Sequence, residues 1–122
     1  MLKLKTKWFN KWAKKNSITD AVLSKTIQDL SSNLGTVNLG AGLYKIRTAK
    51  SGKGKSGSHR TILVYKESDR VIFVYGFSKT EKDNLSSEEL KYFKKLSKDL
   101  LSIEKNKYKQ MIQNGDFISI GE

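Results

Sequence analysis

The spacing of hydrophobic and polar positions changes several times along the first third of this 122-residue chain. Leu2 and Leu4 alternate with lysines, which predicts a short strand at the edge of a sheet. Apolar residues then recur at helical spacing over residues 7–15 and, in a single stripe, over residues 23–34, so we expect two consecutive helices. Ser17-Ile18-Thr19-Asp20 resembles a capping box that opens the second helix.

Glycines at positions 35, 40 and 42 indicate a loop, after which the spacing becomes that of strands. Residues 43–49 alternate between apolar and polar, and residues 60–66 are rich in β-branched side chains. Residues 70–77 are apolar on both faces, as in a central strand. The middle of the chain therefore predicts a three-strand meander.

The last third begins with a second capping-box signal, Ser86-Ser87-Glu88-Glu89, which predicts a helix to about Ser102. A shorter helix is expected over residues 104–113, and residues 117–120 form a last strand or a docked tail. The expected fold is α+β: an antiparallel sheet, made of the N-terminal strand and the meander, carries the helices on one side. We expect it to pack against the two N-terminal helices, with one or two C-terminal helices, as a single domain over residues 1–122.

The composition narrows the function. Lysine and arginine number 24 against 12 acids, and the net charge of +12 predicts an anionic partner. The longest apolar run, residues 71–75, is far too short for a membrane helix, and the N-terminus lacks the apolar core of a signal peptide, so we expect a cytoplasmic protein without a membrane partner. Cysteine is absent and there is one histidine, which excludes disulfides, a cysteine nucleophile and a multi-histidine metal site. We expect no cofactor.

The charge is also unevenly distributed. Between Asp29 and Glu67 there is no acidic residue, which argues against a carboxylate-bound Mg²⁺ in this region. If the predicted strands are neighbours, their cations form one basic surface suited to the charge that develops in phosphoryl transfer. RNA carries its own nucleophile, the 2′-hydroxyl, so such a surface can act on RNA without a metal. The candidate residues are Lys45, Arg47, Lys50, Lys53, Lys55, His59, Arg60 and Lys79.

Residues 49–56 (AKSGKGKS) match a relaxed phosphate-binding P-loop pattern. A P-loop opens a helix, whereas this segment is followed by Gly57-Ser58-His59 and a β-branched strand. We therefore interpret it as a basic glycine-rich loop that can bind phosphates without hydrolysing a nucleotide.

Each candidate also has a structural interpretation. The lysines before Asp20 can form a solvated face, and the strand tyrosines can be sheet packing rather than base-stacking platforms. Trp8 and Trp12 can belong to the helix core or, if exposed, dock a partner. His59 precedes Arg60 on a strand and so points to the opposite face, where it can be structural. Lys79 and Lys82 can be part of a solvated turn.

Four segments together resemble the RelE/HigB-type toxins of bacterial type II toxin–antitoxin modules, in the RelE/ParE superfamily. They are GLYKIR at 42–47, GKGKSG at 52–57, RTILVY at 60–65 and VYGFSKTEK at 74–82. The resemblance implies the same strand, two-helix and meander fold, and a ribosome-dependent mRNA endonuclease. It also implies inhibition by a cognate antitoxin, often a helix-turn-helix protein.

The resemblance assigns the family's catalytic cations to Lys45, Arg47, Arg60 and Lys79. The other positively charged candidates become substrate-binding residues: Lys50, Lys53, Lys55, His59 and Lys82. The chain departs from the pattern at Thr80, where relatives often carry arginine, and at Ser86 and Ser87, in the region where some relatives use a tyrosine base.

The leading hypothesis is therefore a metal-independent endoribonuclease that cleaves mRNA on the ribosome through the RNA 2′-hydroxyl. Two alternatives stay open. One is a non-catalytic protein that binds nucleic acid or the ribosome through the same surface. The other is a ParE-like toxin of the same fold that poisons a topoisomerase.

Overall fold

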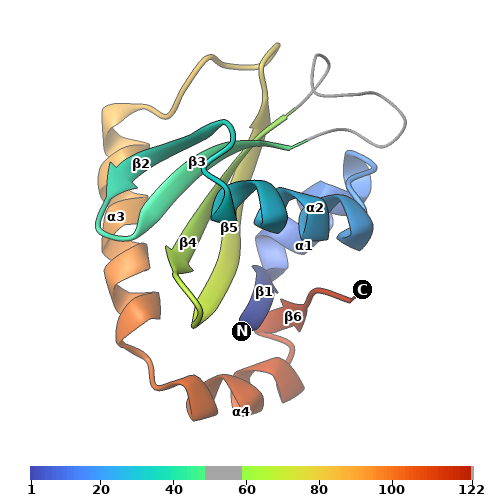
Figure 1. The fold of residues 1–122 in the computed structure, drawn as a ribbon, viewed down its shortest axis with the longest axis vertical. Helices are drawn as coiled ribbons and strands as arrows, with labels where there is room; N and C mark the ends of the chain where they lie inside the picture. Colours follow the sequence, from blue (N-terminus) through green and yellow to red (C-terminus); the bar gives the residue numbers. More distant parts are fainter. Residues whose placement is uncertain (49–58, 122) are drawn as a thin grey trace.

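The computed structural model describes residues 1–48 and 59–121 and contains one mixed sheet of six strands in the order β2-β3-β4-β5-β1-β6 (Figure 1). The strands are β1 (Leu2–Thr6), β2 (Thr36–Gly40), β3 (Leu43–Thr48), β4 (His59–Lys66), β5 (Arg70–Ser78) and β6 (Phe117–Ser119). The helices are α1 (Lys7–Lys15), α2 (Asp20–Ser31), α3 (Ser87–Ser102), the short 3₁₀ helix η2 (Lys105–Lys107) and α4 (Tyr108–Gln113). The α+β class and the antiparallel β3-β4-β5 meander are confirmed.

Helices cover both faces of the sheet, so the prediction that they lie on one side is wrong (Figure 1). On one face, α1 and α2 bury a cluster that includes Phe9, Leu23 and Phe73. On the other, α3 and α4 bury a second cluster that includes Phe93 and Tyr108. Two separate apolar clusters arise because the central strands are apolar on both faces.

The first strand is not at the edge of the sheet. β1 lies between β5 and β6, and it runs parallel to β5, with Leu2 beside Arg70 and Lys5 beside Phe73. The sheet is therefore mixed rather than antiparallel throughout. Leucine and lysine alternate in β1 because the two faces of this interior strand have different surroundings. Leu4 is buried in the cluster that α3 and α4 cover. Lys5 is buried on the other face, in an ion pair with Asp20.

The edge strands are β2 and β6, and the sequence pattern predicts a loop where β2 lies. The second helix ends at Ser31, and Leu34, the last residue of the predicted stripe, is exposed. Gly35 has a φ of +68°, a left-handed conformation that turns the chain from α2 into β2. Strand β2 then pairs antiparallel with β3.

Side-chain caps set the starts of the three long helices. Thr6 caps α1, whose bounds match the prediction, and Ser86 with Glu89 forms the predicted capping box of α3. The start of α2 differs: Thr19 caps the helix, and Ser17 adopts a left-handed conformation outside it. The predicted capping box at residues 17–20 is therefore wrong.

A β-bulge in β5 sets which of its side chains face α3. Pairing between β4 and β5 shifts after Ile62, which lies opposite Tyr75, while Leu63 lies opposite Phe73. Val74 is the extra residue, and both Val74 and Tyr75 pack with the α3-side cluster.

Across the whole described part of the chain, no helix is long and apolar enough to span a membrane.

Candidate functional site

The end of β3 and the start of β4 bring two arginines together. Arg47 lies directly opposite Arg60 in the β3–β4 register, as the sequence hypothesis required. Directly opposed residues share a face, with their Cβ atoms about 5 Å apart. Partial burial of Arg60, followed by repulsion from Arg47, lowers the pKa of the Arg60 guanidinium. We call Arg47 and Arg60 the arginine pair.

Lys45 extends the same face of β3 toward the loop that leads into α3. It precedes Arg47 by two positions, so alternation puts both side chains on one face. The Lys45 amino group donates a hydrogen bond of 3.2 Å to Asn84 Oδ1. An open pocket of about 620 Å³ lies beside these cations, lined by Lys45, the arginine pair and residues 33–37 of the turn into β2. The strand cations therefore face a space that can admit a ligand.

A fourth cation, Lys82, lies over the rings of β5 next to this region. Phe77 lies opposite Arg60 in the β4–β5 register, and the Lys82 amino group sits 5.6 Å from the centres of the Phe77 and Tyr75 rings. Lys82 also forms an ion pair with Glu89 Oε1. Arg47, Arg60 and Phe77 are thus neighbours across β3, β4 and β5, and Lys82, in the segment after β5, lies over Phe77. We call Lys45, Arg47, Arg60 and Lys82 the cation cluster.

Glu89 connects this region to the first turn of α3. Its carboxylate accepts hydrogen bonds from Lys82, from the Ser86 backbone N–H at 2.8 Å and from the Tyr75 hydroxyl at 3.1 Å. These donors, Lys82 first, lower the pKa of Glu89 to about 2. The same ion pair raises the pKa of Lys82, and burial, then the Glu89 carboxylate, raises the pKa of Tyr75. At neutral pH Glu89 is ionised, Lys82 is a cation and Tyr75 is neutral.

One sequence candidate, His59, does not reach the face of the arginine pair. His59 is buried on the α1 face: its Nε2 is 3.2 Å from Asn16 Oδ1, and its ring meets that of Trp12 edge-on at 5.3 Å. Alternation along β4 turns Arg60 to the opposite face. Lys79 follows β5 and is exposed. The predicted phosphate-binding lysines Lys50, Lys53 and Lys55, and the P-loop-like segment that contains them, lie outside the described residues.

Four residues that contact the cation cluster were not predicted as site residues from the sequence: Tyr75, Phe77, Asn84 and Glu89. The position of Glu89 could have been predicted, because the capping-box pattern places its carboxylate at the start of α3. Tyr75 and Phe77 read as sheet packing, which is part of their role. Within residues 1–48 and 59–121, no group of three or more His, Cys, Asp or Glu side chains is arranged to hold a metal ion.

The family model described as RelE toxin of the RelE / RelB toxin-antitoxin system matches residues 1–120. The chain therefore belongs to the RelE toxin family, as the four sequence segments suggested, and is the toxin of a toxin–antitoxin pair. Membership implies a cognate antitoxin as its partner. No curated protein matches the chain significantly.

Proposed function

We propose that this toxin is an endoribonuclease that cleaves mRNA on the translating ribosome, in the cytoplasm. The observation that carries the proposal is the arginine pair, two arginines at directly opposed positions of β3 and β4 that line an open pocket. Placing two like charges opposite one another destabilises the free protein. A bound phosphodiester reverses this cost, because each guanidinium can donate two parallel hydrogen bonds to its oxygens.

The proposed reaction uses the nucleophile that RNA supplies. The 2′-hydroxyl oxygen attacks the adjacent phosphorus, the bond from phosphorus to the 5′-oxygen breaks, and the products are a 2′,3′-cyclic phosphate and a free 5′-hydroxyl. A proton leaves the 2′-hydroxyl and a proton reaches the departing 5′-oxygen. Arg47 and Arg60 stabilise the extra negative charge on the phosphoryl oxygens in the transition state.

The lysines take different parts in this proposal. Lys82 serves as a substrate-binding cation, because the Glu89 carboxylate raises its pKa and keeps it protonated. The candidates for proton transfer are Lys45, which lines the pocket and donates a hydrogen bond to Asn84, and Lys79, which is exposed just after β5. Lys50, Lys53 and Lys55 stay predictions as phosphate-binding residues, and no helix-turn-helix character of the antitoxin is assumed.

The test is cleavage of mRNA on purified ribosomes by wild-type protein and by Arg60→Ala. Loss of one preorganised charge-stabilising donor should reduce the cleavage rate by about 100- to 1000-fold. Lys66→Ala is the matched control, since Lys66 is an exposed cation at the far end of the same strand, and we expect its rate to equal that of the wild type. Circular dichroism checks that each variant is folded.

The chemistry of the new RNA end gives a second readout. Attack by the 2′-hydroxyl leaves a cyclic phosphate or, after its hydrolysis, a 2′- or 3′-phosphate, whereas metal-assisted hydrolysis by water can leave a 3′-hydroxyl. Full activity in folded Arg60→Ala would remove the arginine pair from the reaction. Ribosome binding by the wild type without any strand scission would favour the non-catalytic alternative.

A further inference from the structure

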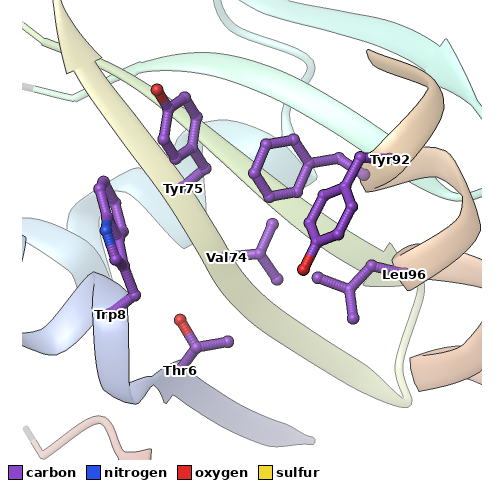
Figure 2. Close-up of a pocket in the computed structure, with 7 residues that line it drawn as sticks. Thr6, Trp8, Val74, Tyr75, Tyr92 and Leu96 are labelled. Carbon is purple, nitrogen blue, oxygen red and sulfur yellow. The ribbon is translucent and has the colours of Figure 1, made fainter. Parts of the chain in front are cut away.

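A second concave surface lies on the α3 side of the sheet, between α1 and α3. It is an open pocket of about 410 Å³ whose floor is β5 and whose walls carry aromatic and aliphatic side chains (Figure 2). Trp8 projects from α1 on one side, and Tyr92 and Leu96 from α3 on the other (Figure 2). We call it the aromatic groove, and its labelled lining residues are Thr6, Trp8, Val74, Tyr75, Tyr92 and Leu96.

The two walls expose unusually large apolar side chains. Tyr92 is 63 % exposed and Trp8 is 47 % exposed, although both are of the kind that proteins bury or use as binding anchors. Trp8 is nevertheless held in place: its ring lies 4.9 Å from Tyr75 and stacks on Trp12 at 6.2 Å. Trp12 in turn packs onto Gly76, where an added Cβ would lie 2.3 Å from its ring. The wall is therefore preorganised, which lowers the entropic cost of binding.

The lining argues against RNA as the occupant. The surface that lines the groove is mostly apolar, Val74, Phe93 and Leu96 carry no polar side-chain atom, and the Tyr75 hydroxyl already donates to Glu89. A nucleobase seated in the groove would lose water from its polar edges without adequate hydrogen-bonding partners, which is costly. An aliphatic or aromatic protein side chain has no such cost.

The charge around the groove argues against a second copy of this chain. The exposed side of α1 carries only lysines as its charged residues, and Lys91 and Lys95 flank Tyr92 on α3; the α1 lysines are Lys7, Lys11, Lys14 and Lys15. Two copies, each with a net charge of +12, would bring these lysines together. A partner of opposite charge is attracted by the same surface.

We propose that the aromatic groove is the docking site of the cognate antitoxin, filled by apolar side chains of an acidic antitoxin segment. Acidic residues beside the apolar anchors pair with the lysines of α1 and α3, which is the charge complementarity that selects one partner and speeds association. The groove ends at Tyr75, whose hydroxyl contacts Glu89 beside Lys82. The docked segment therefore lies next to the cation cluster. The inference rests on membership of a toxin–antitoxin family and not on RNA cleavage.

The experiment measures the affinity of the toxin for its separately purified cognate antitoxin by isothermal titration calorimetry. Tyr92→Ala removes an exposed ring without opening the core and should weaken binding by about 30-fold. Leu96→Glu places a negative charge in the apolar groove, where it repels the acidic partner, and should weaken antitoxin binding by about 100-fold or more. Lys98→Ala, an exposed residue six positions beyond Tyr92 on α3, is the matched control and should change affinity less than threefold.

Two further readouts decide between occupants. If the groove binds the antitoxin, Tyr92→Ala and Leu96→Glu act on ribosomes like the wild type but are no longer inhibited by the antitoxin. Unchanged antitoxin affinity in both folded variants would overturn the proposal, and so would loss of RNA binding or cleavage with affinity intact. A wild-type dimer in light scattering that Leu96→Glu dissociates would assign the groove to a second copy. Absence of cleavage by the wild type would contradict the proposed function alone, because the affinities are measured without RNA.

Discussion

Two arginines on neighbouring strands of this toxin have opposite surroundings. Arg70, at the start of β5, is buried, and its guanidinium donates hydrogen bonds to the carbonyl oxygens of Leu100 at 2.8 Å and Ile103 at 2.7 Å. It also forms an ion pair with Asp69 at 2.6 Å. Arg60, at the start of β4, is half-buried and faces a second arginine.

The difference separates a cation that stabilises the fold from a cation suited to binding. Arg70 satisfies carbonyl groups at the C-terminal end of α3, where the helix dipole also favours positive charge. The Arg60 guanidinium is partly buried and lies beside Arg47, and both effects lower its pKa. The fold thus places Arg70, which is hydrogen-bonded to helix carbonyls, at one end of the sheet and the arginine pair at the other.

The strongest test of this contrast is Arg70→Met, which replaces the buried guanidinium with an apolar side chain of similar length. We expect the free energy of unfolding to fall by about 3 kcal/mol, because the Asp69 charge and the Ile103 carbonyl lose their partner. Urea denaturation followed by circular dichroism measures the change. Lys66→Ala, opposite Arg70 on β4, should stay within about 0.5 kcal/mol of the wild type. Equal stability of Arg70→Met and wild type would refute the structural role.

A smaller effect is expected at Glu89, which joins the cation cluster to α3. Its pKa of about 2 in the folded protein lies below its ordinary value of 4.5, so the unfolded chain takes up a proton first as the pH falls. The stabilisation is complete above about pH 4.5 and is lost toward pH 2. Because Glu89 is partly exposed, we expect about 1 kcal/mol.

Glu89→Gln should therefore be less stable than the wild type at pH 6 by that amount, with the difference shrinking below pH 4.5. Unfolding curves recorded at several pH values measure it. The control is Glu88→Gln, which changes the exposed neighbouring carboxylate in the same helical turn. A constant difference between Glu89→Gln and wild type from pH 6 to pH 2 would contradict the ion-pair account.

The smallest effect concerns the arginine pair itself. Arg47→Gln relieves the repulsion on Arg60 and should raise the free energy of unfolding by about 0.5 kcal/mol. Increasing salt should shrink this gain, since screening weakens the repulsion in the wild type. Thermal unfolding at low and high ionic strength measures both. A destabilised Arg47→Gln would mean that Arg47 supports the fold, and the contrast with Arg70 would disappear.

The sequence predicted what local spacing encodes. Helix α1, the capping box of α3 and the alternation of Lys45 and Arg47 on β3 depend on neighbours a few positions away. Strand β2 was missed because its glycines and the exposed Leu34 mimic the end of a helix and a loop.

What local spacing does not encode is the pairing of distant segments. The parallel pairing of β1 with β5 joins residues almost seventy positions apart, and no alternation pattern specifies it. The bulge at Val74 likewise lies in a run that is apolar on both faces, so its effect on Tyr75 had no visible sign. The contacts of Glu89 with Tyr75 and Lys82 depend on that bulge and on the position of α3, so only the structure shows them.

The interior position of β1 has a consequence for biosynthesis. Strand β1 finds its neighbours only at residues 70–73 and 117–119, so the sheet is completed only after residue 119 has been made. Contacts so far apart in sequence slow folding, because a long loop must close before they form. A nascent chain of this toxin therefore lacks its complete sheet until residues 117–119 have left the ribosome.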